Sequence, residues 1–419
     1  TSGEAGERLA FAPHVLAASY LATRQWAKAI ASLELLKQRL PSTKVVLGGS
    51  HPTALPERTL SECKADFLVL GEGEITLDEL VGQIGSGAGD WGSIKGLAFR
   101  DGDGSVVVNE PRPLIEDLDT LPFPARDLVD NDLYYPPPTK KVSSGLSTLI
   151  STSRGCPFNC GFCSANTVWM SRRIRSRSAE NLVDEMTECV RRYGISSFNF
   201  ADEFFTADKA RVLEICELIG RRGLEITWVC SARAQKLDRQ TLETMKRAGC
   251  LELSFGIESG SPEILERMDK RIDLDEAKRV ISTANDLGIR THAGFIIGYP
   301  GETEQTVRQT VRAARWLDVD IAAFWIASPL PGSRLWDEAQ TNGWIRPDAR
   351  WSDFSPLSNN TSVLMLPTLS IEQIRRLHRR ALRNYYLRPK YIIRKLLSIR
   401  HPYQVMNLLK GLRILLRIK

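Results

Sequence analysis

Hydrophobic and polar residues follow two patterns that alternate along the first hundred residues. The short apolar runs HVLAASYL, KVVLGGS and ADFLVLGEGE are separated by the segments WAKAIASLELLKQRL and TLDELVGQI, whose apolar positions recur at helical spacing. Short apolar runs predict buried strands, and apolar residues three or four apart predict amphipathic helices. We therefore expect a parallel α/β sheet over residues 1–100, with its ligand surface at the strand ends.

Residues 101–146 break this alternation. They contain the turn sequence DGDG and two proline-interrupted segments, LDTLPFPARDL and YYPPPTKK. Proline fixes φ and removes a backbone donor, so it interrupts both helices and sheets. We interpret residues 101–146 as a linker.

Strand and helix patterns alternate again, over a longer stretch, in residues 147–345. Helical periodicity occurs near 178–193, 206–222, 238–248, 261–287 and 303–316. The apolar runs that flank these helices are STLISTS, SSFNFAD, EITWVCSA, LELSFGIES, IRTHAGFIIGY and DIAAFWIAS. Six strand–helix repeats predict a partial (β/α)6 TIM-like barrel, whose active face lies at the carboxyl ends of the strands.

Residues 346–419 form a predicted C-terminal helical basic region. A helix is expected over 366–388, starting near Ser370, and a cationic amphipathic stretch follows Pro389. Residues 371–419 carry 14 Lys and Arg against one acidic residue, whereas the rest of the chain carries 42 basic and 49 acidic side chains. The net charge of +6 therefore describes an acidic body with a basic tail.

Three interpretations of this tail stay open: a helix pair packed across the barrel, an anchor on an anionic membrane surface, and a nucleic-acid-binding segment without a recognisable signature. The chain has 42% hydrophobic and 25% charged residues, which predicts folded domains rather than disorder. It contains no apolar run of membrane-spanning length and no signal-peptide pattern, so a cytoplasmic chain is expected, with peripheral membrane contact as an alternative.

Three of the eight cysteines, Cys156, Cys160 and Cys163, lie within the segment RGCPFNCGFC, where the first barrel strand ends. Thiolates are the ligands that iron–sulfur clusters require, and three of them leave one iron of a four-iron cluster open to a small molecule. A closed structural zinc site needs a fourth ligand, and no histidine lies nearby in the sequence to supply it. Zinc and coincidental buried thiols are the alternatives.

The spacing C-x3-C-x2-C, with Phe162 before the third cysteine, resembles the signature of the radical S-adenosylmethionine (radical SAM) enzymes, and the resemblance extends over residues 147–345. It implies a [4Fe–4S] cluster on the three cysteines, with SAM chelating the open iron. Reduction would cleave SAM to a 5′-deoxyadenosyl radical that abstracts hydrogen from the substrate. An electron donor such as flavodoxin or ferredoxin is the implied partner.

Polar residues at the ends of the later strands are suited to binding SAM in such a protein. Asp202 and Glu203 could accept hydrogen bonds from the methionyl ammonium group, although an acidic pair also suits a helix start. Ser231 and Arg233 could hold the carboxylate, with a surface arginine as the alternative. Glu258 lies in an apolar strand, where a carboxylate is costly unless it is paired, and could bind the ribose hydroxyls.

The segment GFIIGYPGE resembles the glycine-containing fifth-strand motif of the same family. Gly294 and Gly298 would let the backbone approach the adenine and ribose closely, and the family pattern implies that Phe162 lies near the adenine. The sequence identifies no catalytic residue beyond these cofactor contacts.

The amino-terminal residues also resemble a known module. Ser19-Tyr-Leu21, followed after 26 residues by Gly48-Gly49, is similar to the S-x-L … G-G pattern of cobalamin-binding α/β domains. The motif D-x-H-x-x-G that precedes it in that family is missing, because only 18 residues precede Ser19 and His14 is not in that pattern. The domain is therefore expected to be an incomplete cobalamin-binding domain, and cobalamin is left open as a cofactor.

Three hypotheses on function follow. The first is a radical SAM enzyme of the cobalamin-associated group that starts C-methylation, cyclisation or rearrangement of an organic or lipid-like small molecule, as a methyltransferase or an oxidative-cyclase-like enzyme. The second is a radical SAM enzyme that does not use cobalamin, with a structural amino-terminal domain. The third is a zinc module that binds nucleic acid through the tail, although no specific nucleic acid is predicted.

Overall fold

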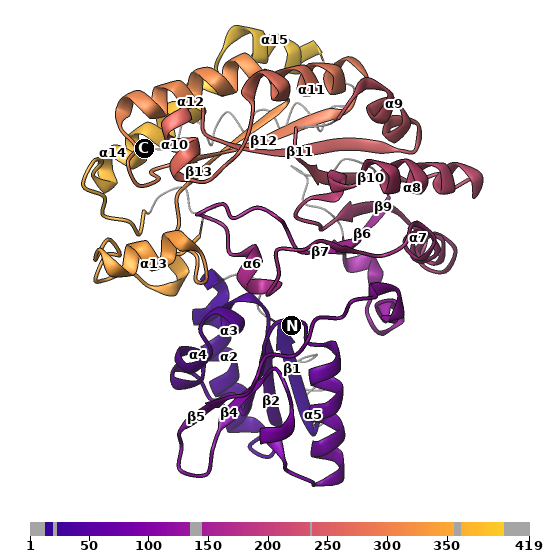
Figure 1. The fold of residues 1–419 in the computed structure, drawn as a ribbon, viewed down its shortest axis with the longest axis vertical. Helices are drawn as coiled ribbons and strands as arrows, with labels where there is room; N and C mark the ends of the chain where they lie inside the picture. The colour runs from indigo at the N-terminus through magenta and orange to yellow at the C-terminus, as the bar shows by residue number, and fades with distance from the viewer. Residues whose placement is uncertain (1–12, 20–22, 135–144, 235–236, 356–361, 398–419) are drawn as a thin grey trace. The chain divides into compact units, whose positions relative to one another are not determined.

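The computed structural model describes residues 13–19, 23–134, 145–234, 237–355 and 362–397, which form two compact units (Figure 1). The first unit comprises Thr1–Glu116, Gly161–Arg172 and Ser328–Ser358. The second comprises Asp117–Cys160, Arg173–Ala327 and Asn359–Lys419. The chain passes between the units several times, and one of these passages falls directly after Cys160, inside the cysteine motif.

A five-stranded sheet forms the centre of the first unit, with the strand order β1-β2-β3-β4-β5. The first three strands are parallel, and the last two are antiparallel to their neighbours. The bounds are β1 Val15–Ser19, β2 Lys44–Gly48, β3 Phe67–Val69, β4 Leu97–Arg100 and β5 Val106–Val108. The strands predicted from the three apolar runs are therefore confirmed.

Helices and buried side chains lie on both faces of this sheet. Val45 and Leu47 of β2 pack with Trp26 and Leu33 on one face, whereas Val46 packs in a second cluster on the other. A strand buried on both faces carries a continuous apolar run, as KVVLG does. The helices are η1 Thr23–Gln25, α2 Trp26–Arg39, α3 Ser50–Ala54, α4 Pro56–Glu62, α5 Glu74–Ser86 and η2 Trp91–Ser93.

Two segments from later in the chain complete the first unit. They contain α6 Ala165–Val168, α13 Arg334–Thr341 and η7 Trp351–Asp353. The Trp351 indole N–H donates to Glu62 over 2.8 Å, as does that of Trp26, and His51 stacks on the Trp26 ring with a centroid distance of 4.9 Å. Residues 328–358 thus belong to the unit that the sequence analysis limited to residues 1–100.

The predicted linker begins too early. Val106–Val108 lies within the predicted range 101–146 but forms β5, which pairs with β4 through Val107 and Phe99. The DGDG sequence is the turn of the hairpin that β4 and β5 form. It therefore lies within the first unit and does not mark the end of a domain.

Six parallel strands form the second unit, in the order β6-β9-β10-β11-β12-β13. Neighbours in space are therefore neighbours in this part of the sequence, which is the topology of a half-barrel. The bounds are β6 Leu146–Ile150, β9 Ile195–Phe200, β10 Thr227–Ala232, β11 Cys250–Glu258, β12 Arg290–Ile297 and β13 Ile321–Ile326. Each strand lies within a predicted apolar run or one residue beyond it.

Helices cover one face of this sheet (Figure 1). They are α7 Ala179–Tyr193, α8 Lys209–Arg221, α9 Arg239–Arg247, α10 Pro262–Arg267, α11 Leu274–Asp286 and α12 Glu304–Leu317. The second unit also contains the short helices η3 Leu118–Thr120, η4 Arg126–Leu128, η5 Asn131–Leu133 and η6 Phe205–Ala207. The helix predicted over 261–287 is two helices, because Asp269 adopts a φ of 50° that no continuous helix permits. Alternate strand residues such as Trp228 and Phe255 are buried, whereas Ser231 and Ser254, which alternate with them, are only partly buried.

The predicted basic region begins with two helices, α14 Ile371–Tyr386 and α15 Pro389–Leu397. Ser370 and Gln373 cap α14 reciprocally, which confirms the predicted start. The Tyr386 hydroxyl donates to the Ala322 carbonyl over 2.8 Å, and Arg388 pairs with Asp318 at 2.7 Å. Both helices therefore pack against the β13 side of the half-barrel. Within the described part of the chain, no helix has the length and hydropathy needed to cross a membrane.

Candidate active site

The cysteine motif directly follows β7 Ser153–Arg154, in the long connection between this strand and its antiparallel partner β8 Arg175–Ser176. Gly155, directly before Cys156, has a φ of 98°, and a Cβ built on it would lie 2.2 Å from the backbone oxygen of Arg173. No side chain fits there without moving the hairpin, so glycine is required to start the cysteine loop.

The motif cysteines differ from the others in exposure. Cys156 and Cys160 are partly buried and Cys163 is exposed, and all three are free thiols; the other five cysteines, Cys63, Cys189, Cys216, Cys230 and Cys250, are buried. Chain connectivity keeps Cys163 within about 11 Å of Cys160. Among the described residues, no three His, Cys, Asp or Glu side chains converge as ligands of a single metal ion. Ligation of an iron–sulfur cluster by the three motif cysteines stays a prediction.

Two cations act on Cys160. Burial raises the pKa of its thiol, whereas Lys270 and Arg233 lower it by stabilising the thiolate. The Arg233 guanidinium lies 3.5 Å from the centre of the Phe158 ring and donates to the Arg271 carbonyl. Positive charge beside this thiol favours the ligand form that iron binds.

Asp202 is buried and is held by the end of the first barrel strand. Its carboxylate accepts hydrogen bonds from the Thr152 backbone N–H and the Ser153 hydroxyl, both at 2.7 Å, and from the Thr152 hydroxyl. Asp202 therefore fixes the residues that lead into the cysteine loop. Glu203 is adjacent and partly buried. Contact of either carboxylate with the methionyl ammonium group stays a prediction.

Ser231 and Arg233 lie at the carboxyl end of β10, as predicted. Ser231 is the register partner of Ser254 on β11, and its side chain is on the face opposite the buried Cys230 and Ala232. Both residues are thus at the same sheet edge as Glu258, and their contact with the methionyl carboxylate stays a prediction.

Glu258 is a buried carboxylate in an unusual backbone conformation. Its φ is 69°, and the register between β11 and β12 shifts between Gly256 and Glu258. A non-glycine residue at positive φ costs roughly 1–3 kcal/mol, and such residues cluster at functional sites. The bulge turns the side chain at the strand end. Burial raises the pKa of Glu258, and Lys270, 3.3 Å away, opposes that rise.

The fifth-strand glycines are placed where the sequence predicted them. Gly294 lies within β12 beside Trp325, and Gly298 follows the strand with a φ of 84°. The backbone N–H groups of Gly298 and Tyr299 donate to the Glu302 carboxylate, which is fully buried. Glu302 therefore closes this turn from within, and burial raises its pKa to about 8.

This buried carboxyl predicts a pH-dependent stability. Above its ordinary pKa of 4.5, Glu302 ionises in the unfolded chain but stays protonated in the fold up to about pH 8, so stability falls as pH rises between these values. Replacing Glu302 with Gln should raise the free energy of unfolding at pH 8.5 by roughly 3–5 kcal/mol and change it little near pH 5. Denaturant unfolding at both pH values tests this. An equal loss of stability at both would contradict it.

Phe162 and Cys163 belong to the first unit, where the chain continues into α6. Phe162 is partly buried, and its neighbour Gly161 accepts a hydrogen bond from the Leu335 N–H over 2.8 Å. The expected position of Phe162 near the adenine stays a prediction.

The cobalamin-like pattern also converges in the first unit. Ser19 ends β1 and is the register partner of Gly48, and Gly49 has a φ of 99°. Thr53 connects the segments that follow β2 and β3. Its hydroxyl donates to the Gly49 carbonyl over 2.8 Å and accepts from the Gly71 N–H over 3.0 Å. Serine and glycine are both small, so the carboxyl ends of β1 and β2 carry little side-chain bulk. Leu21 lies outside the described residues.

Sequence reasoning missed four residues of these sites. Lys270 lies in a turn twelve residues after Glu258, and Glu302 is the last residue of the segment GFIIGYPGE, in which only the glycines were given a role. Gly155 and Thr53 could have been found by their position in the sequence. Gly155 directly precedes Cys156, and Thr53 lies four residues after Gly49.

Two family profiles match the chain. The radical SAM superfamily matches residues 150–314, and the B12-binding domain matches residues 7–81. An uncharacterized methyltransferase of Pyrococcus horikoshii is 37% identical over 369 residues, covering 88% of this chain and 77% of the relative. The anaerobic magnesium-protoporphyrin IX monomethyl ester cyclase of Rubrivivax gelatinosus is 32% identical over 317 residues, covering 74% of this chain and 56% of the relative.

Solved structures share the fold. The cobalamin-dependent radical enzyme OxsB, solved with aqua-cobalamin and SAM, has a TM-score of 0.73 and 16% identity, covering 99% of this chain and 64% of the other. The methyltransferase TsrM of Kitasatospora setae, with tryptophan and a SAM analogue, has a TM-score of 0.67 and 22% identity, covering 81% of this chain and 68% of the other. The chain belongs to the radical SAM superfamily, in the group that joins a B12-binding domain to the barrel.

Proposed function

We propose that this chain cleaves SAM reductively and uses the resulting radical chemistry, with cobalamin, to transfer a methyl group to carbon in a small organic molecule. The observation that carries the proposal is the placement of Arg233 and Glu258 at the strand ends that accompany the cysteine loop, with Arg233 acting on Cys160. The relative named as a methyltransferase supports the type of reaction.

Each cofactor would be held by residues already described. Cys156, Cys160 and Cys163 would ligate the cluster, and the edge formed by Ser19 and Gly48 would receive cobalamin. When bound, the cluster supplies the electron that cleaves SAM, and cobalamin supplies a carrier for the methyl group.

The protein's own part is to bind and orient SAM. Arg233 is suited to the methionyl carboxylate by a charge-assisted hydrogen bond, and Glu258 to the ribose hydroxyls. The backbone at Gly294 and Gly298 would approach the adenine, with Trp325 and Ile374 packed where their Cβ atoms would lie. Holding the reacting groups in one geometry is the main contribution a protein makes to such chemistry.

Cobalamin use separates the first proposal from the alternative of a SAM-only enzyme. The purified chain, incubated with hydroxocobalamin and desalted, should retain a corrin spectrum near one equivalent. Replacing Gly48 with Val should reduce retention, because a branched side chain would add bulk at the strand end where cobalamin is proposed to bind. The Cβ itself would make only an ordinary contact, 3.4 Å from the Val69 carbonyl. A wild-type chain that retains no corrin would favour the SAM-only alternative.

Ring closure is a second candidate, favoured by the likeness to the Rubrivivax cyclase. Incubation with S-(methyl-13C)adenosylmethionine and candidate substrates distinguishes the two. Methyl transfer leaves the label in the product, whereas cyclisation gives an unlabelled product. The superfamily assignment replaces the zinc-module hypothesis.

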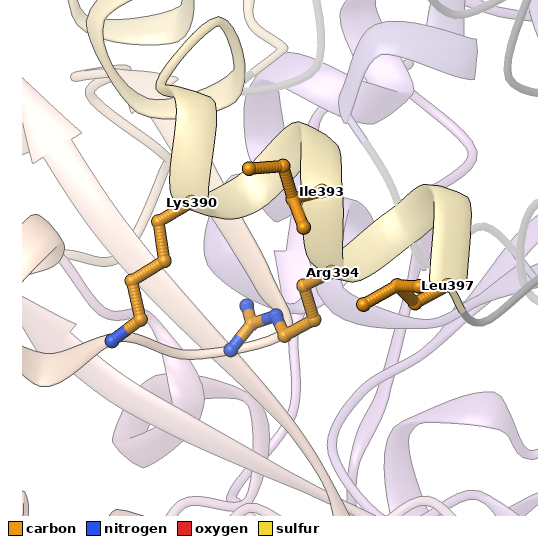
Figure 2. Close-up of a pocket in the computed structure, with 4 residues that line it drawn as sticks. All are labelled: Lys390, Ile393, Arg394 and Leu397. Carbon is orange, nitrogen blue, oxygen red and sulfur yellow. The ribbon is translucent and has the colours of Figure 1, made fainter.

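Partners beyond the substrate belong to the same proposal. A radical SAM enzyme needs a one-electron donor such as flavodoxin or ferredoxin. We also propose contact between α15 and an anionic membrane surface. Lys390, Ile393, Arg394 and Leu397 line an open depression on this helix (Figure 2), and the Ile393 and Leu397 side chains are 56% and 77% exposed. Exposed apolar residues beside cations are typical of interfacial helices.

Vesicle binding tests this contact. The wild-type chain should co-sediment with phosphatidylserine vesicles more than with neutral phosphatidylcholine vesicles. Replacing Ile393 and Leu397 with Glu should reduce the bound fraction several-fold. Replacement of Leu128, which is 81% exposed elsewhere, with Glu is the control. Equal sedimentation of all variants would contradict the proposal.

A further inference from the structure

Lys270 is a buried cation that the mechanism above does not use. It follows α10, where the positive φ of Asp269 reverses the chain and the Lys270 N–H donates to the Leu265 carbonyl over 2.8 Å. Its side chain is only 9% exposed, and its Nζ atom lies 3.3 Å from Oε1 of Glu258. The turn thus directs an amine of the α10–α11 loop to the end of β11.

Gly256 provides the space for this pair. A Cβ at that position would lie 2.3 Å from Glu258 Oε1 and 3.0 Å from Lys270 Nζ. Three separate features therefore converge on one ion pair: a strand residue without a side chain, a carboxylate at positive φ, and a lysine placed by a left-handed turn.

The Lys270–Glu258 ion pair is not explained by a contribution to folding stability. A buried ion pair contributes little net stability, because desolvation of both groups offsets their attraction. The backbone of Glu258 adds roughly 1–3 kcal/mol of strain. Strained, buried charges at a strand end are typical of residues that serve a ligand.

The charges around this pair support a ligand of mixed polarity. Arg233 also lowers the pKa of Glu258, so two cations face one carboxylate, and both act on Cys160. The direct contact of Lys270 is with the Glu258 carboxylate. Because Lys270 contacts Glu258 directly, it can act on bound SAM through Glu258 without contacting SAM itself.

We propose that Lys270 is a positioning residue of the SAM site, which holds the Glu258 carboxylate charged and aimed at the ribose hydroxyls of SAM. The proposal rests on the proposed function, because it assigns SAM to this site. Without Lys270, Glu258 would lose its direct ion pair and keep only the electrostatic effect of Arg233. A buried carboxyl in that state protonates or turns away and so becomes a poorer acceptor for two hydroxyl groups.

The test is a double-mutant cycle on SAM affinity, measured by calorimetry on the full chain after anaerobic cluster reconstitution. Replacing Glu258 with Gln or Lys270 with Met should each weaken SAM binding about tenfold or more. The double variant should bind no more than about threefold weaker than Glu258→Gln alone, because Lys270 acts through Glu258. Lys270→Arg should restore most of the affinity.

The control is Lys278→Met on α11, whose Nζ donates to the Leu317 carbonyl, and it should leave affinity within about twofold. If Lys270→Met fails to fold or to hold its cluster, the double variant, which removes both charges, and Lys270→Arg still decide the outcome. Unchanged affinity in Lys270→Met, or additive losses in the cycle, overturns the inference alone. A wild-type chain that holds a cluster but does not bind SAM overturns the proposed function together with it.

Discussion

Replacing Cys160 with Ala is expected to abolish the iron–sulfur cluster and, with it, SAM cleavage. In the proposed site three thiolates would hold the cluster, and the other cysteines of the described chain are buried, so none of them is placed to substitute for one that is lost. The absorbance of the reconstituted cluster should disappear, and the yield of 5′-deoxyadenosine should fall at least about a hundredfold. Iron and sulfide analysis after anaerobic reconstitution measures the first effect, and chromatography of the nucleoside measures the second.

The matched control is Cys216→Ala. Cys216 is buried within α8, and burial raises the pKa of its thiol to about 12, so it behaves as a small apolar side chain. This variant should retain wild-type iron content and lose only a little stability. Equal loss of iron in both variants would show that the effect of Cys160→Ala comes from misfolding, and normal iron content in Cys160→Ala would contradict the assignment of the ligands.

Replacing Gly155 with Ala is expected to disrupt the cysteine loop, although Gly155 is not one of the proposed cluster ligands. An alanine at a φ of 98° is strained by roughly 1–3 kcal/mol, and its Cβ would collide with the Arg173 carbonyl at 2.2 Å. The β7–β8 hairpin must then move. We expect the free energy of unfolding to fall by about 2–4 kcal/mol and the reconstituted iron content to fall well below that of the wild type.

Gly194 provides a control at the same kind of backbone position. It ends α7 with a φ of 65°, and a Cβ there would meet nothing within 4 Å. Gly194→Ala should therefore cost about 1 kcal/mol and leave the iron content unchanged. Denaturant unfolding and iron analysis of the two variants separate the collision from the general penalty of a positive φ. Equal behaviour of the two would contradict the role given to Gly155.

The half-barrel could be predicted from sequence because its information is local. Each strand, such as β10 or β12, is an apolar run whose alternate residues are buried under helices, and each helix shows its own periodicity. The shared position of the cysteine motif, Arg233, Glu258 and Gly298 at one edge of the sheet could then be predicted from their order along the chain. Consecutive parallel strands bring their carboxyl ends to the same edge.

The composition of the first unit could not be predicted in the same way. Residues 161–172 and 328–358 join it through contacts far apart in sequence, such as the Trp351 indole N–H on Glu62 and the Thr167 hydroxyl on the Gly332 carbonyl. No periodicity encodes such contacts, because they depend on the tertiary fold. The start of the linker at residue 101 was wrong for a related reason. The DGDG sequence predicts a turn, but a turn sequence does not show whether the strands on either side of it pair.

The ion pair of Lys270 shows a third limit. A lysine in a polar loop between two helices is usually exposed, and nothing local marks this one as buried. Its place follows from the left-handed turn at Asp269 and from the space at Gly256, both of which are visible only in three dimensions.

One measurement tests the central claim most directly. The full chain is reconstituted anaerobically with iron and sulfide, desalted, and incubated with SAM and a strong reductant such as dithionite. We expect about four irons and four sulfides per chain and release of 5′-deoxyadenosine that depends on both SAM and the reductant. A folded chain that takes up no iron and sulfide, or that holds a reduced cluster without cleaving SAM, would contradict it.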